Sequence, residues 1–218
     1  MDYLPIFLKI EDRKCLVVGG GKVAVRKVTL LKRAGAHITI VSPQLCDELN
    51  ALLKQGAVTH VAREFQDEDL HECVLVIAAT DVKAVNRRVS GLANAQRIPV
   101  NAVDSPERCS FIMPSMIDRS PVQIAVSTGG ASPVLARLLR SRLESFIPAA
   151  YGRLAQLVDD YRDRVKQRFT VPEQRRHFWE NILQGRVAEL LFAGHEEKAR
   201  IALQEAIDDT DAHYNDPG

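Results

Sequence analysis

The sequence predicts an α/β protein that ends in a small all-helical domain, and three observations support this prediction. Apolar strands alternate with amphipathic helices from residue 4 to residue 113, and a glycine-rich turn joins an early strand to its helix. From residue 148 onward every long segment has the period of a helix. Since the strands show no polar alternation, we expect a doubly wound parallel sheet covered on both faces, followed by the helices.

The expected elements follow these patterns in chain order. Strands are expected at residues 4–10, 15–18, 37–41, 58–62, 74–79, 99–103, 110–113 and 122–127. Helices are expected at residues 22–33, 44–55, 82–95, 134–146, 149–169, 172–182, 186–192 and 196–208, the fourth of them capped by Ser132 with Pro133 at its first position. The chain thereby divides into a sheet domain at 1–113, a connecting segment at 114–147, a helical domain at 148–208 and a polar tail or linker at 209–218.

Length and composition bound the class of protein. The chain has 218 residues, of which 46% are hydrophobic, and this suffices for a real core. No apolar run is long enough for a membrane helix and no signal-like segment opens the chain, so we expect a cytoplasmic protein. The four cysteines lie far apart without a Cys-x-x-Cys pair, which argues against a zinc site and against a disulfide framework.

The net charge of +1 argues against nucleic acid as a partner, but the charge is unevenly distributed along the chain. Residues 133–186 carry 11 basic and 6 acidic side chains, whereas residues 187–218 carry 2 basic and 8 acidic ones. On charge alone, solvated helix faces are the preferred explanation of the basic segment, and an acidic ligand is the alternative.

A turn with the spacing Gly19-x-Gly21-x-x-Ala24 ends one expected strand and opens the first expected helix. Gly19 permits the tight turn, Gly21 lets a pyrophosphate approach the backbone, and Ala24 allows close packing of the helix. The backbone N–H groups of Lys22 and Val23 are then available to the phosphates. A glycine triplet alone also satisfies ordinary turn geometry, but here the flanking strands complete a βαβ unit. We therefore predict a dinucleotide-binding domain of the Rossmann type.

The second strand of that unit ends at Ser42, Pro43 and Gln44, without a carboxylate. Domains that bind NAD commonly place an acidic residue there to bind the ribose hydroxyls. We assign Ser42 and the backbone of Pro43 and Gln44 to the ribose, and a plain strand-terminating turn is an equal alternative. These residues leave the choice between NAD and NADP open.

Six motifs in fixed order resemble one family over nearly the whole chain. They are Tyr3 to Phe7, Val17 to Ala24 with Arg26 and Lys27, Ala78 to Asp81, Asn101 to Asp104, Phe111 to Ser115, and Val126 to Pro133. Through these motifs the chain resembles the N-terminal module of siroheme synthase, which is similar to stand-alone precorrin-2 dehydrogenases that also act as sirohydrochlorin ferrochelatases. Larger members of this family continue into a uroporphyrinogen methyltransferase, so a stand-alone enzyme and a piece of a longer one both fit the sequence.

The resemblance implies an NAD-dependent oxidation of precorrin-2 to sirohydrochlorin, followed by insertion of ferrous iron, as a substrate, to give siroheme. It implies Asp104 as the acid–base residue of both steps, Thr80 as a cofactor contact, and Asn101 and Ser127 as substrate contacts. Asp104 follows an apolar strand at the sheet edge where ligands bind in this fold class, and a carboxylate there can accept protons in both reactions. Without the resemblance, an aspartate that caps a turn before Ser105 is the preferred explanation.

The tetrapyrrole substrate is a polycarboxylate, so the basic segment contains candidate ligands for it. Guanidinium groups bind carboxylates in a bidentate manner, and we assign Arg137 and Arg140 to the substrate. The turn at Thr128 and Gly129 can bind a further carboxylate at a helix start, and simple capping is an equal alternative. The histidines lack paired ligand spacing, so we predict no resident metal.

Two other functions also fit the sequence, and a homodimer is expected. A dehydrogenase without chelatase activity and an NAD-sensing regulatory module fit the same motifs, whereas a conventional small-molecule dehydrogenase lacks support because no Tyr-x-x-x-Lys occurs. The helical domain can bury little apolar surface alone, so we expect a homodimer. We expect residues 122–147 of each chain to contact the other chain, and we name 114–147 the dimerisation segment for this reason.

Overall fold

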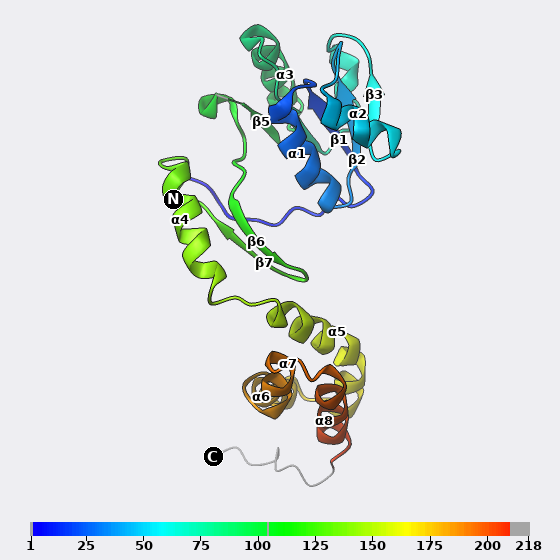
Figure 1. The fold of residues 1–218 in the computed structure, drawn as a ribbon, viewed down its shortest axis with the longest axis vertical. Coiled ribbons are helices and arrows are strands. Elements are labelled where there is room, and N and C mark those ends of the chain that lie inside the picture. The colour runs from blue at the N-terminus through cyan, green and yellow to red at the C-terminus, as the bar shows by residue number, and fades with distance from the viewer. Residues whose placement is uncertain (1, 104, 210–218) are drawn as a thin grey trace. The chain divides into compact units, whose positions relative to one another are not determined.

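The computed structural model describes residues 2–103 and 105–209 (Figure 1). It consists of two compact units, one formed by residues 1–113 with 129–131 and the other by residues 114–128 with 132–218. The expected acid–base residue Asp104 and the tail beyond Asp209 lie outside the described residues.

The first unit is built on a five-stranded parallel sheet with the strand order β3-β2-β1-β4-β5. Its strands are β1 (Lys14–Val18), β2 (His37–Val41), β3 (Thr59–Val61), β4 (Leu75–Ala78) and β5 (Val100–Ala102). Its helices are α1 (Lys22–Arg33), α2 (Asp47–Lys54) and α3 (Lys83–Ala95), with short 3₁₀ helices η1 (Asp67–Leu70) and η2 (Pro106–Arg108). The strand order reverses between β1 and β4, so the predicted doubly wound α/β fold is confirmed.

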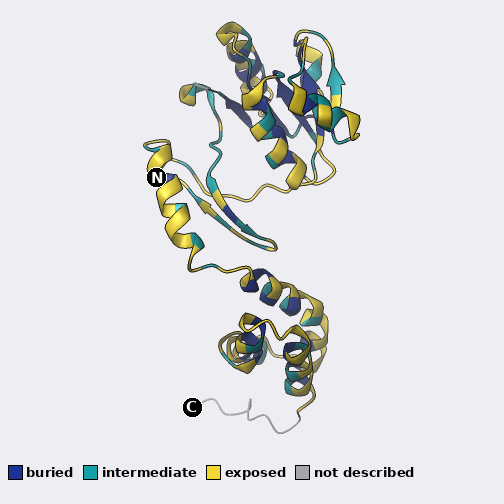
Figure 2. Cartoon of the chain, viewed as in Figure 1, coloured by how far each residue is buried: buried dark blue, intermediate teal, exposed yellow. Residues whose placement is uncertain are grey.

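Alternate side chains of each strand supply two separate cores. Val17 of β1 packs in one core with Val28 of α1, whereas its neighbour Leu16 packs in the other core with Val89 of α3. All four side chains are fully buried, and Figure 2 shows the central strands dark while the outer faces of the helices are exposed. Because successive strand residues point to opposite faces, an unbroken apolar strand needs helices on both sides.

The second unit combines a hairpin with a group of helices. Its elements are β6 (Ser115–Arg119), β7 (Val122–Val126), α4 (Pro133–Glu144), α5 (Ala150–Arg168), α6 (Pro172–Gln184), α7 (Arg186–Phe192) and α8 (Glu196–Asp208). Ser132 Oγ accepts a hydrogen bond from the Leu135 N–H at 3.1 Å, so the predicted cap of α4 is confirmed. The last four helices share a core around Phe178, whose ring centroid lies 5.0 Å from that of Phe169. No helix in the described ranges is long and apolar enough to cross a membrane.

The strand expected at residues 4–10 is absent, and that prediction is wrong. Both sides of β1 are already paired, with β2 and β4, so the preceding segment finds no place beside it in the sheet. Pro5 also has no N–H to donate to a ladder. Leu4 and Ile6 remain 75% and 71% exposed. An apolar sequence therefore does not make a strand unless it pairs with another strand.

The strand expected at residues 110–113 is also wrong, because side chains replace the ladder there. The Ser110 N–H donates to the Val100 carbonyl oxygen at 2.9 Å, but the Val100 N–H donates to Ser110 Oγ at 2.8 Å. The Ala102 N–H donates to Cys109 Sγ at 3.2 Å. These bonds close the outer edge of β5, and the next strand is β6, which the sequence analysis missed. The other expected elements are present, with ends shifted by at most three residues.

Candidate functional site

Two glycines in the turn after β1 are required by close contacts. Gly19 has a φ of +121°, and a Cβ on it would lie 2.2 Å from the Ala79 carbonyl oxygen. A Cβ on Gly20 would lie 1.9 Å from the Gln44 carbonyl oxygen and 2.8 Å from Ser42 Oγ. The need for Gly20 could not be predicted from local spacing, because the atoms that crowd it come from the loop after β2.

Gly21 is different, since nothing lies within 4 Å of the position that its Cβ would occupy. It is the N-cap residue of α1, no side chain caps this helix, and its first turn contains no acidic residue. The exposed residues Lys22 and Val23 therefore present backbone N–H groups without a capping side chain. Open room beside an uncapped helix N-terminus fits a pyrophosphate, which the positive end of the helix dipole attracts.

The loop after β2 is fixed by its own hydrogen bonds. Ser42 Oγ donates to the Gln44 carbonyl oxygen at 2.8 Å, and the Cys46 N–H donates to the Gly20 carbonyl oxygen at 2.8 Å. These bonds hold the loop against the glycine turn, and α2 begins three residues later than expected. Ser42 is 9% exposed, whereas Pro43 and Gln44 are exposed. Ser42 thus shapes the loop, and its two exposed neighbours are the parts open to a ligand.

A buried asparagine that the sequence analysis missed holds the loop after β4. Asn86 of α3 is 5% exposed, and its Nδ2 donates to the Thr80 carbonyl oxygen at 2.8 Å. Its Oδ1 accepts from the Thr80 N–H at 3.1 Å and from Thr80 Oγ1 at 2.9 Å. The loop begins with Ala79, whose carbonyl oxygen touches Gly19. A polar residue in a helix is usually exposed, so spacing alone does not mark Asn86.

The residues expected to bind the cofactor therefore meet at the carboxyl ends of β1, β2 and β4. The glycine turn touches the Ser42–Gln44 loop on one side and the Ala79–Thr80 loop on the other. Ligands of doubly wound sheets bind at this edge, where the strand order reverses. The structure thus brings together residues of separate loops that were predicted to bind the cofactor.

Asn101 occupies the neighbouring strand end, in β5. It pairs in register with Ile77 of β4 and is 9% exposed. Its Nδ2 donates to the Phe111 carbonyl oxygen at 3.1 Å, and its Oδ1 accepts from Lys27 Nζ at 3.1 Å. Both ends of the amide are thus bonded within the protein. Asp104, which follows β5 in the sequence, is outside the described residues.

The turn before α4 uses its polar groups locally. Thr128 Oγ1 donates to the Ser132 carbonyl oxygen at 3.1 Å and accepts from the Ser132 N–H at 3.0 Å. Gly129 and Gly130 adopt φ values of +64° and +90°. The hydroxyl of Thr128 therefore stabilises the turn, as the capping alternative expects, while Ser127 precedes this turn at the end of β7.

The two arginines assigned to the substrate differ in their surroundings. Arg137 is exposed, and it has no carboxylate partner in the part of the chain that the structure describes. Arg140 forms an ion pair with Glu144, which also lies 3.3 Å from Arg119. Both belong to α4 in the second unit. Of these two arginines, only Arg140 has a carboxylate partner among the described residues.

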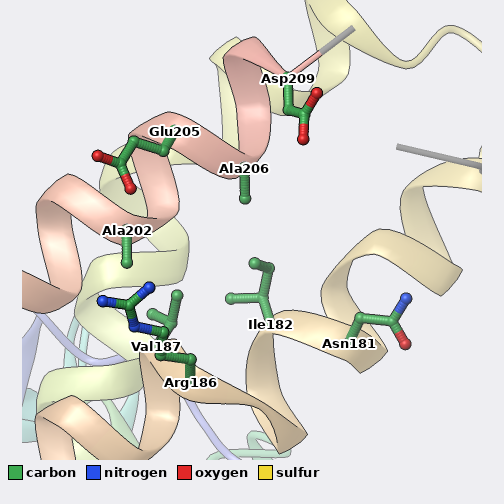
Figure 3. Close-up of a pocket in the computed structure, with 8 residues that line it drawn as sticks. All are labelled: Asn181, Ile182, Arg186, Val187, Ala202, Glu205, Ala206 and Asp209. Carbon is green, nitrogen blue, oxygen red and sulfur yellow. The ribbon is translucent and has the colours of Figure 1, made fainter. Parts of the chain in front are cut away.

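A hollow of about 270 Å³ in the second unit lies apart from these residues (Figure 3). It is lined by Asn181, Ile182, Arg186, Val187, Ala202, Glu205, Ala206 and Asp209. No residue assigned to cofactor or substrate lines it, so we give it no part in the reaction. Within residues 2–103 and 105–209, no three His, Cys, Asp or Glu side chains are grouped to hold a metal.

Three family models match the chain in succession. Residues 6–115 match a model described as "Putative NAD(P)-binding", residues 119–145 one described as "Sirohaem biosynthesis protein central", and residues 150–207 one described as "Sirohaem synthase dimerisation region". The dimerisation description thus covers the helices α5 to α8. The assignment of residues 114–147 as the dimerisation segment stays a prediction.

Curated relatives and a solved structure agree with these models. A siroheme synthase of Thioalkalivibrio sulfidiphilus is 60% identical over 95% of this chain and 42% of that protein. One of Nitrosospira multiformis is 58% identical over 95% of this chain and 45% of that protein, so the chain spans less than half the length of both. The solved structure of SirC, a precorrin-2 dehydrogenase, matches with a TM-score of 0.66 at 26% identity, over 94% of this chain and 95% of that one.

Proposed function

Because this chain belongs to the family of NAD(P)-binding modules of siroheme synthases, we propose that it oxidises precorrin-2 to sirohydrochlorin with NAD, as a step of siroheme biosynthesis. The observation that carries this proposal is the uncapped N-terminus of α1 beside Gly21. That open phosphate site lies in a chain that a precorrin-2 dehydrogenase resembles over 94% of its length. Other helices of the chain also lack a capping side chain, and α1 differs from them by its glycine turn at the sheet edge where the strand order reverses.

The cofactor residues have distinct roles in this proposal. The N–H groups at Gly21, Lys22 and Val23 bind the pyrophosphate, because they are the unpaired donors at the start of α1. The exposed backbone and side chains of Pro43 and Gln44, shaped by Ser42, contact the ribose, and Thr80 borders the other side of the turn. When bound, NAD supplies the acceptor for the hydride that the tetrapyrrole loses.

Asp104 is the proposed proton acceptor. It follows β5, whose carboxyl end lies next to that of β4 and so beside the cofactor loops. Oxidation of the reduced tetrapyrrole releases a hydride and a proton, and insertion of ferrous iron releases two pyrrole N–H protons, so one carboxylate can serve both reactions. The chelatase step, with ferrous iron as its second substrate, is the finer part of the proposal.

Substrate contacts are proposed separately for residues of each unit. Arg137 offers an uncommitted guanidinium to a carboxylate of the substrate, while Arg140 can do so only by sharing or leaving Glu144. Asn101, Ser127, Thr128 and Gly129 remain proposed contacts, supported by the motifs that carry them. The hydrogen bonds of Asn101 and Thr128 already engage much of their polar capacity, so we expect Arg137 to contribute most to affinity.

A homodimer is proposed on the surface of α4. Apolar side chains along this helix are exposed: Val134, Leu135, Leu138, Leu139 and Leu143. Ala136 is the one buried residue of α4, and Figure 2 shows most of this helix as exposed. An exposed apolar stripe of this kind needs a partner surface, and a second copy of the chain supplies one. The match of residues 150–207 to a dimerisation region supports a homodimer, but it covers α5 to α8 and does not include α4.

Anaerobic incubation of the chain with precorrin-2 and NAD, while absorbance is recorded, tests the proposal. We expect NADH to form in step with the spectrum of sirohydrochlorin, and a later addition of ferrous iron to give the spectrum of siroheme. NADH formation without iron insertion would reduce the function to the dehydrogenase alone. Binding of NAD without any change in the tetrapyrrole spectrum would instead favour a sensing module.

A further inference from the structure

Lys27 of α1 contacts a strand that is distant from it in the sequence. Its Nζ donates to Asn101 Oδ1 at 3.1 Å, across a separation of 74 residues. Lys27 is half-buried, and no carboxylate within ion-pair distance of it occurs among residues 2–103 and 105–209. Burial lowers the pKa of this lysine below its ordinary value. Burial of an ammonium group costs folding free energy unless it is hydrogen-bonded, and the hydrogen bond to Asn101 meets this need among the described residues.

Asn101 is a polar side chain on an otherwise apolar face. The register places it beside Ile77, in the layer where Val17 and Val28 form the core. Its two amide atoms have opposite partners: an ammonium can only donate, and the carbonyl oxygen of Phe111 can only accept. The orientation of the Asn101 amide is therefore determined by its surroundings, and Lys27 supplies one of the two constraints.

The same strand end is held by Cys109. Its Sγ accepts from the Ala102 N–H at 3.2 Å and lies 3.3 Å from the Ser105 carbonyl oxygen. Asn101 Nδ2 lies 3.6 Å from that sulfur atom, so the amide, the thiol and the end of β5 form one network. Residue 104 stands in the chain between the two segments that this network holds.

We propose that Lys27 is a positioning residue of the dehydrogenase site: its ammonium orients the Asn101 amide at the carboxyl end of β5. This inference rests on the proposed function. It assigns to Lys27 an effect on turnover through Asn101, without contact to cofactor or substrate. Its effect is therefore expected on kcat, and the KM for NAD is expected to stay unchanged.

A double-mutant cycle tests the inference, using Lys27→Met, Asn101→Ala and the double variant. We expect each single variant to lower the kcat of NADH formation by about tenfold, and the double variant to be no slower than Asn101→Ala, because residues that act through one contact are not additive. Lys27→Arg keeps a donor and should recover most of the lost rate. Lys32→Met, on the same helix and exposed, is the matched control and should behave as the parent chain.

Two outcomes would overturn the inference. If the loss of kcat in the double variant equals the product of the losses in the two single variants, Lys27 acts directly on substrate or cofactor and not through Asn101. If Lys27→Met has the same kcat as the parent chain, Lys27 has no role in turnover. If Lys27→Met does not fold, the cycle is repeated with Lys27→Gln, which is shorter but polar, and additivity there has the same meaning. A parent chain without NADH formation would overturn the proposed function first, whereas additivity in an active enzyme would overturn this inference alone.

Discussion

The side chain of Asn86 forms hydrogen bonds with both the backbone N–H and the backbone carbonyl oxygen of Thr80. Its Nδ2 donates to the Thr80 carbonyl oxygen at 2.8 Å, and its Oδ1 accepts from the Thr80 N–H at 3.1 Å. One buried side chain of α3 thus holds the loop that lies against the glycine turn. Residues 79–82 belong to no strand, so the hydrogen bonds to Asn86 take the place of ladder bonds in this loop.

Asn86→Asp should weaken NAD binding and lower stability. The carboxylate can still accept from the Thr80 N–H, but it cannot donate to the Thr80 carbonyl oxygen, so a buried acceptor loses its donor. Such a loss costs about 1–3 kcal/mol, and we expect the free energy of unfolding to fall and the dissociation constant for NAD to rise about tenfold or more. Asn94→Asp, on the exposed part of the same helix, should change neither. Calorimetry and denaturant unfolding of both variants decide this; equal NAD affinity in the two would contradict it.

Gly21→Leu should abolish NAD binding without unfolding the chain. Nothing in the structure lies within 4 Å of a Cβ at this position, so the side chain fits the unliganded protein but occupies the space proposed for the pyrophosphate. Gly20→Ala should behave in the opposite way, since its Cβ would meet the Gln44 carbonyl oxygen at 1.9 Å. We expect it to lower the free energy of unfolding by about 1–3 kcal/mol or more. Calorimetry with NAD and thermal melts separate the two, and unchanged NAD affinity in Gly21→Leu would remove the phosphate assignment.

Charge reversal at Arg137 should raise the KM for the tetrapyrrole more than charge reversal at Arg140. Arg137 has no carboxylate partner in the described residues, whereas Arg140 is already paired with Glu144. The effect should act on KM more than on kcat and weaken as salt is added, because exposed charges are screened. Steady-state kinetics at two ionic strengths measure it. If the KM of neither variant depends on salt, the basic face of α4 is only a solvated surface.

Asp104→Asn should reduce dehydrogenase and chelatase rates together. The substitution preserves size but removes the proton acceptor, and general acid–base groups contribute about a hundredfold to ten-thousandfold in rate. NAD affinity should persist, because the phosphate site uses backbone groups at Gly21 to Val23. NADH formation and iron insertion are measured separately on this variant. Persistence of either rate near that of the parent chain would show that Asp104 is not the common base.

Local residue spacing was sufficient to predict helices and helix caps, because the residues that stabilise them are close together in the sequence. The helices α7 and α8 have their expected ends, and the cap of α4 by Ser132 is present, because helix period and capping depend on residues within one or two turns. The strand errors have the opposite cause. Residues 4–10 have strand-like apolarity but no partner strand, and Ser110 pairs with β5 through its hydroxyl, which composition does not reveal.

The sequence by itself determined the doubly wound α/β fold, the glycine turn that opens α1 and the helical character after residue 148, since each depends on a repeating local pattern. Only the tertiary structure decided which glycines are crowded, that Asn86 holds Thr80, and that Lys27 reaches Asn101. The physical reason is distance along the chain: Gly20 is crowded by the loop after β2, and the partner of Lys27 is 74 residues away. Steric room and hydrogen-bond partners of this kind exist only once the strands and loops have been brought together.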